Sequence, residues 1–298
     1  MIVEYRLAVR NGIVSIKLEH VSYVYMPGTP YEKEALKDVS LEINKGEFVA
    51  VIGHTGSGKS TLVQNLNGLL HPSKGTASLD GTDLSGKTQE AKQARGRIGM
   101  VFQYPEHQLF AETVYEDIAF GPRNLGLNND ETDARVREAM KFVGLDFETY
   151  ARRSPFSLSG GQMRRVAIAG VVAMNPDYLI LDEPSAGLDP GSRRAVFAEI
   201  MALYKKRGIA IIMVTHSMED AAKYAKRLLV INRGQIILDG RPGEIFLKEK
   251  NRLLEVGMDV PEVYKLADAL RAKGLRLPHE ITDAKLLLAE VKRRKGLK

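Results

Sequence analysis

The sequence of 298 residues contains no cysteine. It can therefore form no disulfide and no zinc site with thiolate ligands, and it is compatible with the reducing cytosol. Long apolar runs are also missing, because the longest, such as residues 166–174, have about half the length of a membrane span. The first residues, MIVEYRLAVRNG, carry charges where a secretory signal would be apolar. These absences predict a chain that does not enter the bilayer by itself.

The overall composition and charge exclude little. Hydrophobic residues make up 44% of the chain and charged residues 27%, as in ordinary folded proteins. The 43 basic and 37 acidic side chains leave a formal net charge of +6. This mild excess is compatible with an anionic ligand, a membrane surface, a nucleic acid or a solvated basic surface. The length allows one large domain with a small appendix, or two domains.

Hydrophobic periodicity predicts an α/β fold interrupted by helices. Residues 15–25 alternate apolar and polar side chains like a strand, and FVAVI at 48–52 is the continuous apolar run of a buried parallel strand. The predicted strands are 15–25, 38–43, 47–52, 75–79, 97–102, 178–182, 209–214, 227–231 and 235–239. The predicted helices are 59–69, 113–119, 131–143, 161–173 and, in a small appended module at 241–298, residues 261–273 and 282–294. Since strands lie on either side of residues 105–175, these residues are predicted to form a helical subdomain inserted into an α/β core.

A glycine-rich loop at residues 53–61, GHTGSGKST, predicts a phosphate site. Gly53, Gly58, Lys59 and Ser60 have the spacing of a P-loop, and the loop lies between an apolar strand and a helical stretch. Glycines let the backbone wrap around phosphates, while the helix N-terminus and the lysine supply positive charge. The serine hydroxyl is the expected Mg²⁺ ligand. The residues predicted to hold ATP are Gly53, His54, Thr55, Gly56, Ser57, Gly58, Lys59, Ser60 and Thr61.

A second chemical element is the strand YLILDE at residues 178–183, which ends in two carboxylates. In open α/β sheets, ligands bind at the carboxyl ends of the strands. Beside a P-loop, Asp182 is expected to hold Mg²⁺ through water. Glu183 is expected to polarise the water that attacks the γ-phosphate.

A third element is LSGGQ at residues 158–162, which precedes the helical run MRRVAIAGVVAM. Ser159 is a candidate cap, and Gly160 and Gly161 leave the first N–H groups open, so the helix N-terminus is a second anion site. One γ-phosphate does not need two cradles from one subunit. The sequence therefore predicts a two-fold-related dimer in which Ser159, Gly160, Gly161 and Gln162 face the nucleotide of the other chain.

The order of these motifs resembles the nucleotide-binding domain of ABC transporters over residues 15–240. The P-loop, Gln103, LSGGQ, YLILDE, SAGLD and His216 follow one another as in that family. The resemblance implies a P-loop NTPase with a RecA-like core, an antiparallel β subdomain, the helical insertion and a small C-terminal helical module. Residues 1–240 are then the nucleotide-binding domain.

The same resemblance implies further roles. Tyr25 matches the aromatic residue that stacks on adenine, with Tyr23 as its rival, and Asp189 matches an aspartate that crosses the dimer interface. Asp189 also has the position of a helix cap before Pro190. The implied catalytic residues are Lys59, Gln103, Glu183 and His216, and the implied Mg²⁺ ligands are Ser60, Gln103 and Asp182, partly through water.

The segment FQYPEHQLFAETVYEDIAFGPRNLG at residues 102–126 resembles the ATPases of energy-coupling-factor (ECF) vitamin importers and their cobalt and nickel relatives. In that group a PE-x-QLF stretch meets a transmembrane coupling protein. The matching residues are Pro105, Glu106, Gln108, Leu109 and Phe110. Exposed Leu109 and Phe110 beside Gln103 would suit a helix-in-groove contact. Without the family match, local packing of the helical insertion explains the segment equally well.

The run SPFSLSGGQMRRVAIAGVVAMNP resembles the A-prime member of the two ECF ATPases, which implies a heterodimer with a paralogue. A cobalt or nickel importer ATPase, usually a homodimer, is the alternative. Two positions depart from the pattern of these ATPases. Ser157 stands where an acidic residue is usual, and Ser185 stands where threonine is usual. The resemblance also implies a location on the cytoplasmic face of the membrane, and only indirect contact with a substrate-binding membrane subunit.

The C-terminal tail is predicted to help hold the two ATPases together, as such tails do in the ECF group. The basic residues at the end of the tail are predicted to be the solvated end of a helix, and contact with anionic lipid is the alternative. The basic residues are Lys292, Arg293, Arg294, Lys295 and Lys298.

Other classes of ABC ATPase fit less well. Repair and chromosome ATPases carry coiled coils or zinc modules, and ribosomal factors carry two nucleotide domains, whereas this chain has one P-loop. No nucleic-acid partner is therefore expected. The presence of both Glu183 and His216 argues against a structural subunit that does not hydrolyse ATP.

Overall fold

A computed structural model describes residues 15–278, 281 and 283–295. The N-terminal residues, which were predicted not to be a secretory signal, lie outside the described residues. The basic residue Lys298 lies outside them as well. None of the helices formed by the described residues is long and apolar enough to span a membrane.

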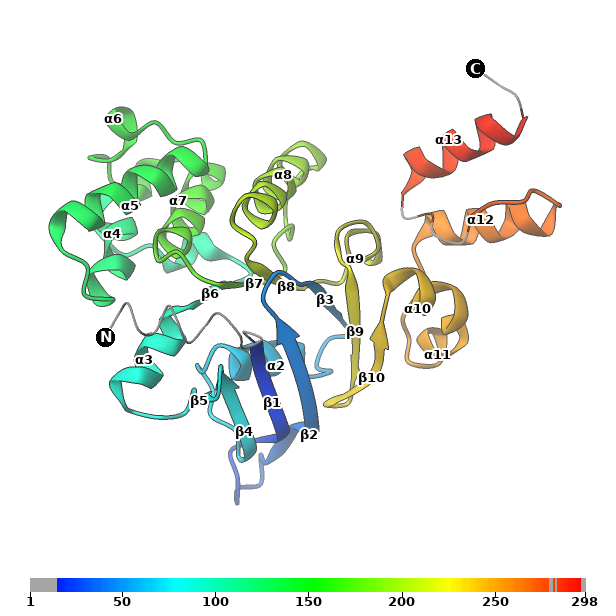
Figure 1. Cartoon of the computed structure of the whole chain (residues 1–298), viewed down its shortest axis with the longest axis horizontal. Coiled ribbons are helices and arrows are strands. Elements are labelled where there is room, and N and C mark those ends of the chain that lie inside the picture. Colours follow the sequence, from blue (N-terminus) through cyan, green and yellow to red (C-terminus); the bar gives the residue numbers. More distant parts are fainter. Residues whose placement is uncertain (1–14, 279–280, 282, 296–298) are drawn as a thin grey trace.

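The central sheet has six strands in the order β10-β9-β3-β8-β7-β6 (Figure 1). All neighbours pair in parallel except β9 and β10. The strands are β3 (Phe48–Ile52), β6 (Ile98–Val101), β7 (Tyr178–Asp182), β8 (Ala210–Val214), β9 (Arg227–Asn232) and β10 (Gln235–Gly240). Val51 of β3 pairs with Val214 of β8, and Val214 pairs with Asp182 of β7. The carboxyl ends of these three strands therefore lie at the same level of one sheet edge.

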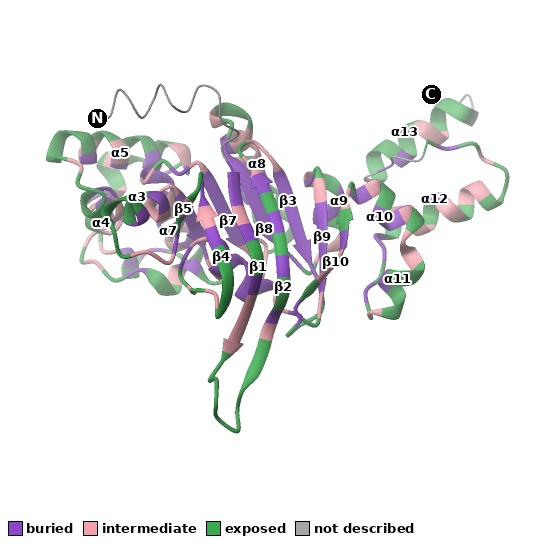
Figure 2. Cartoon of the chain, turned by 60° about the horizontal axis from the view of Figure 1, so that its bottom comes forward, coloured by how far each residue is buried: buried purple, intermediate pink, exposed green. Residues whose placement is uncertain are grey.

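A second sheet is antiparallel and has the order β2-β1-β4-β5. Its strands are β1 (Ser15–Tyr25), β2 (Lys33–Asn44), β4 (Lys74–Leu79) and β5 (Thr82–Asp83). Helix α2 (Lys59–Leu66) shares one core with both sheets, since Leu62 and Leu66 pack in the same cluster as Ile16 and Val49. The burial view shows the central strands covered and the hairpin between β1 and β2 exposed at its tip (Figure 2).

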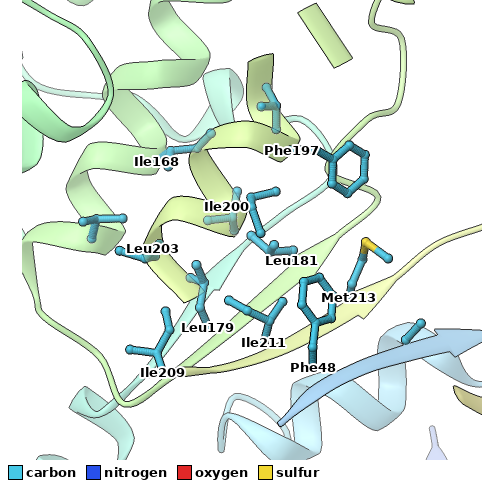
Figure 3. Packing of buried hydrophobic residues seen from close by; sticks show 14 of the residues in the cluster. Phe48, Ile168, Leu179, Leu181, Phe197, Ile200, Leu203, Ile209, Ile211 and Met213 are labelled. Carbon is cyan, nitrogen blue, oxygen red and sulfur yellow. The ribbon is translucent and has the colours of Figure 1, made fainter. Parts of the chain in front are cut away.

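Both faces of the central sheet are buried, as its continuous apolar strands predict. Along β3, Val49 and Val51 pack toward the antiparallel sheet, whereas Phe48 and Ala50 belong to the core on the other face. Figure 3 shows that second core: Leu179 and Leu181 of β7 and Ile211 and Met213 of β8 lie against helix side chains. The contacting helical residues labelled there are Ile168, Phe197, Ile200 and Leu203. This packing fixes α7 (Gly160–Ala173) and the helix that follows β7 against the central sheet.

The helical insertion forms a subdomain on one side of the molecule, opposite the C-terminal module (Figure 1). It contains η1 (Pro105–Gln108), α4 (Val114–Asn124), α5 (Asn129–Phe142), α6 (Phe147–Tyr150), η2 (Pro155–Ser157) and α7 (Gly160–Ala173). Helix α7 packs against α4, α5 and η1 and also reaches β6. It thereby connects the insertion to the central sheet.

Several helices were not predicted from the sequence. The most important are α8 (Pro190–Arg207) and α9 (Met218–Tyr224). Helix α3 (Gln89–Gly96), which precedes β6, was not predicted either. The C-terminal extension contains α10 (Pro242–Lys248), α11 (Lys250–Glu255), α12 (Glu262–Ala272) and α13 (Ala284–Lys295). The last two lie where helices were predicted at 261–273 and 282–294, whereas α10 and α11 were not predicted. Strand β2 also begins at Lys33, earlier than predicted. Helix α8 was readable from its caps, since Asp189 accepts from Gly191 and Ser192 and Gly208 ends it with φ 61°.

Candidate nucleotide-binding site

The loop between β3 and α2 can be built only with glycines at two positions. A Cβ on Gly53 would lie 2.3 Å from the carbonyl oxygen of Ile231. Gly58 has φ +112°, and its Cβ would lie 2.7 Å from the carbonyl oxygen of Ala35. The backbone therefore passes closely over neighbouring strands, and the N–H groups that begin α2 stay free of side chains.

Lys59 is buried within this loop. Its Nζ donates to the carbonyl oxygens of Gly53 at 2.8 Å and His54 at 3.1 Å. Burial lowers the pKa of Lys59, and the negative charges of Glu183 and Asp182 oppose that shift. The ammonium thus shares one electrostatic environment with the two carboxylates that end β7.

The turn between β9 and β10 braces the loop. Gly234 N donates to the Ser57 carbonyl oxygen at 2.8 Å, and His54 Nε2 lies 2.9 Å from Asn232 Oδ1. Ser57 Oγ is buried without a hydrogen-bond partner. No role for Asn232 or Gly234 was predicted from the sequence, because their contact with the loop depends on β9 lying beside β3.

Asp182 and Glu183 follow directly from the central sheet. Glu183 has a left-handed backbone, with φ 52°, and its N–H donates to the Val214 carbonyl oxygen at 3.0 Å. Glu183 Oε1 lies 3.5 Å from His216 Nε2. Burial raises the pKa of Glu183, and it also raises the pKa of Asp182, where the charge of Lys59 and a hydrogen bond from Ser60 act in the opposite direction.

His216 lies just beyond β8, with 51% of its side chain exposed. Burial lowers the pKa of this imidazole, and the charge of Lys59 lowers it further. The structure thus brings Lys59, Ser60, Asp182, Glu183 and His216 to one place, from segments far apart in the sequence.

Tyr25 lies at the entrance to this group. Its hydroxyl is 3.1 Å from Thr61 Oγ1, and its side chain stays partly exposed. Tyr23 meets the Tyr25 ring edge-on, with centroids 4.8 Å apart, and packs against the core. The geometry therefore favours Tyr25 over Tyr23 as the residue available to a base.

The oxygen atoms needed by Mg²⁺ are present beside the loop. The Ser60 side chain forms a hydrogen bond with the Asp182 carboxylate. Glu183 Oε1 is buried with no hydrogen-bond partner. Within the described residues, no group of three or more His, Cys, Asp or Glu side chains could hold a metal alone. Such a donor set fits Mg²⁺, which keeps waters and phosphate oxygens among its ligands.

The LSGGQ segment lies on the surface of the helical subdomain. Ser159 caps α7 and forms a capping box with Gln162. A Cβ would meet nothing within 4 Å at Gly160 or Gly161. Asp189 is also exposed and caps α8. Helices α7 and α8, which these residues begin, pack on one face of the central sheet, whereas α2, which the P-loop begins, packs on the other face (Figure 1).

In the segment after β6, two neighbouring apolar residues differ in burial. Gln103 is exposed, and Phe110 is 61% exposed and meets Phe120 edge-on at 4.9 Å. Leu109 is only 7% exposed and packs in the core of the helical subdomain. The expectation that Leu109 is exposed was wrong. For this residue the alternative, local packing, is correct.

Comparison with known proteins agrees with the geometry. The family model for the ABC transporter matches residues 36–186. The chain is 53% identical over 281 residues to the energy-coupling factor transporter ATP-binding protein EcfA2 of Clostridium perfringens, covering 93% of this chain and 98% of that protein. The EcfA2 of Clostridioides difficile is 49% identical, with coverages of 95% and 100%.

The chain belongs to the ABC transporter ATPases of the energy-coupling factor group.

Solved structures of ABC ATPases have the same fold. CbiO1 of Clostridium perfringens, part of the ABC transporter complex cbiONQ, is 38% identical with a TM-score of 0.70, covering 86% of this chain and 100% of that chain. The dimeric ATP-binding cassette MJ0796, in a post-hydrolysis state with ADP and Pi, is 30% identical with a TM-score of 0.67 and coverages of 76% and 98%. The predicted ABC ATPase fold, ECF resemblance and ATP hydrolase activity are confirmed.

A buried arginine beside the site of this ABC ATPase was not predicted from the sequence. Arg164 of α7 is 5% exposed and donates to the carbonyl oxygens of Pro184 and, at 3.3 Å, Ala186. Its guanidinium thus ties the helix that begins at LSGGQ to the loop after Glu183. The sequence offers no signal for this, because an arginine within a helical run is usually solvated.

Proposed function

We propose that this ECF-group ATPase hydrolyses Mg²⁺-bound ATP in composite sites shared with a second ATPase. The energy would drive uptake of a vitamin or similar micronutrient through a transmembrane coupling protein. The observation that carries the proposal is the convergence of Lys59, Asp182, Glu183 and His216 at one sheet edge. The transported substrate is chosen by another membrane subunit, which this chain meets only indirectly.

Each group has a role that its environment supports. The P-loop N–H groups and Lys59 bind the phosphates, and Tyr25 covers adenine. Ser60, Asp182 and Gln103 hold Mg²⁺, which supplies positive charge on the phosphate oxygens. Glu183 orients and polarises the attacking water, since burial raises its pKa toward that of a useful base. His216 lies 3.5 Å from Glu183 and would contact the γ-phosphate.

The second half of each site comes from the other chain. Ser159, Gly160, Gly161, Gln162 and Asp189 face outward and would meet the nucleotide bound by the partner. The EcfA2 relatives support a paralogue rather than a second copy, and MJ0796 was solved as a dimer. The C-terminal module, with Leu266, Leu286 and Leu288 all exposed by at least half, is a dimerisation element. The complex would sit on the cytoplasmic face of the membrane.

The pairing is tested by changing Gly161 to Asp. The space at this position admits a side chain, so the chain should fold and bind ATP in its own P-loop. In the pair, the new carboxylate would face the partner's γ-phosphate, where like charges about 4 Å apart repel by about 4 kcal/mol at a surface-like dielectric. We expect at least a tenfold loss of ATPase activity, measured as phosphate release by the assembled complex.

The matched control for this change is Ala134→Asp on the exposed face of α5, with an expected normal rate. If the Gly161→Asp complex hydrolyses ATP at the normal rate, the LSGGQ segment does not act across the interface, and composite sites are refuted.

Membrane docking would use the exposed aromatic face formed by Tyr104, Phe110 and Phe120. Changing Phe110 to Ser should weaken capture of the transmembrane coupling protein by roughly tenfold or more, because an exposed aromatic anchor contributes on the order of 2 kcal/mol at an interface. ATP binding by the free chain should not change. Binding would be measured by co-purification in detergent and by transport in vesicles.

The control for docking is Leu69→Ser, since Leu69 is 56% exposed and lies beyond the end of α2. Leu109 is unsuitable as a docking test, because its burial would make Leu109→Ser a stability variant. Full capture of the coupling protein by the Phe110→Ser chain would rule out docking through this face.

A further inference from the structure

Asp220, in the first turn of α9, is a buried carboxylate outside the set of residues assigned to the nucleotide. It is 5% exposed. Ser185 Oγ donates to its Oδ2 at 3.2 Å, and Arg193 Nη2 lies 2.6 Å from the same oxygen. Ser217 Oγ accepts from Asp220 N at 3.1 Å and from Arg193 Nη2 at 2.7 Å. These four residues, here called the Asp220 cluster, form one connected hydrogen-bond network.

The members of the Asp220 cluster come from three segments: the turn after Glu183, the turn after His216 with α9, and the first turns of α8. Ser185 lies two residues after Glu183, and Ser217 directly follows His216. Arg193 belongs to the first turns of α8, which Asp189 caps. The cluster therefore connects the two hydrolytic side chains to the helix whose N-terminus is proposed to face the other ATPase.

Packing holds α8 and α9 together beyond the cluster. Phe197 of α8 and Tyr224 of α9 stack with centroids 4.2 Å apart and planes inclined by 8°. Both helices contribute to the core that covers the central sheet. A shift of α8 would therefore move α9 and the Asp220 carboxylate with it.

The backbone of Glu183 depends on support from its neighbours. Its left-handed conformation is unfavourable for a residue with a side chain and persists only when the surroundings hold it. The strand side is held by the bond from Glu183 N to Val214, and the turn is closed by Ala186 N donating to the Glu183 carbonyl at 3.0 Å. Within this turn, the Ser185 hydroxyl is the side-chain group that reaches α9.

We propose that Asp220 is a positioning residue that keeps Glu183 and His216 aligned with each other and with α8. This inference rests on the proposed function. The contacts of Asp220 are with Ser185, Ser217 and Arg193, so it acts through these residues. Its loss should lower the rate of the chemical step and leave ATP affinity nearly unchanged, because misplacement of a reacting group costs turnover rather than ground-state binding.

The same cluster explains why a side chain with a hydroxyl group stands at position 185. Threonine is usual there in the resembling ATPases, and both side chains carry the hydroxyl that reaches Asp220. Ser185→Thr should therefore preserve the connection, whereas Ser185→Ala removes it with minimal change of volume. This pair separates the hydrogen bond from general packing.

The test compares Asp220→Asn, Ser185→Ala and Ser185→Thr in the full chain, assembled with its second ATPase and coupling protein in vesicles. We expect kcat to fall by about tenfold to a hundredfold for Asp220→Asn and by several-fold for Ser185→Ala, with KM for ATP within about twofold of normal. Ser185→Thr should keep kcat within about twofold of the unchanged chain. If Asp220→Asn does not fold, the Ser185 pair decides the question.

The matched control is Asp239→Asn on β10, which removes another arginine-paired carboxylate. Arg227 contacts Asp239 at 2.7 and 2.6 Å, away from the nucleotide groups. Its kcat should be normal. Normal kcat in both Asp220→Asn and Ser185→Ala would overturn the positioning role, as would an equal loss in Asp239→Asn or a loss that appears only in KM.

Glu183→Gln in the same vesicles separates the positioning role from the proposed function of the site. If it abolishes hydrolysis while the Asp220 cluster variants are normal, only the positioning role is wrong. If Glu183→Gln is itself normal, the proposed function of the site fails.

Discussion

Changing Glu183 to Gln should reduce ATP hydrolysis by a factor on the order of 10² to 10⁴, the contribution typical of a positioned general base. Glutamine has nearly the same shape and keeps a hydrogen-bonding oxygen, so the contact toward His216 at 3.5 Å need not move. It has no basic oxygen to polarise water. ATP binding should remain, because Lys59 and the P-loop are untouched. The closed dimer should consequently accumulate.

Two measurements check this outcome. Phosphate release reports turnover, and gel filtration with ATP reports the closed dimer. Glu148→Gln is the matched control, since the Glu148 side chain is 83% exposed in the helical subdomain. Unchanged turnover in Glu183→Gln would remove Glu183 from the mechanism.

Changing Lys59 to Ala should weaken ATP binding itself by about one to two orders of magnitude. A hydrogen bond to a charged group contributes about 1.5–3 kcal/mol, and each 1.4 kcal/mol is tenfold in affinity. Lys59 is held inside the loop by the carbonyl oxygens of Gly53 and His54, so its ammonium is already in place for phosphate. Its loss also leaves Asp182 and Glu183 without their neighbouring positive charge.

A titration of ATP by calorimetry or a fluorescent analogue measures this loss. Lys87→Ala is the control, because Lys87 is exposed on the loop before α3. A normal ATP titration for Lys59→Ala would contradict the assignment of the phosphate site. The Glu183 and Lys59 variants differ in kind, because one keeps binding and loses turnover whereas the other loses binding.

The nucleotide motifs were predictable because each is a local pattern with a local cause. The glycines of the P-loop are required by backbone geometry within a few residues, as the close approaches at Gly53 and Gly58 show. The apolar runs of β3, β7 and β8 were predicted to within one residue at their ends. Their periodicity reflects burial on both faces, which a sequence records directly.

The features that were missed have no comparable hydrophobic periodicity. Helix α8 was not recognised although Asp189 and Gly208 cap it, because residues 190–207 carry polar side chains on more than one face. Leu109 and Phe110 are adjacent and both apolar, yet one is buried and the other exposed. Their directions depend on how η1 packs against α7, which no local pattern encodes.

The sequence by itself determined the family, the glycine-rich loop and the acidic strand end of this ATPase, since these depend on residue types at short spacing. Only the tertiary structure decided which distant groups meet. The strand order places β8 between β3 and β7, so His216 joins Lys59 and Glu183, and it brings Asp220 against Ser185 and Arg193. The physical reason is that strand order and helix packing depend on burial summed over the whole core. A motif determines only the conformation of its own few residues.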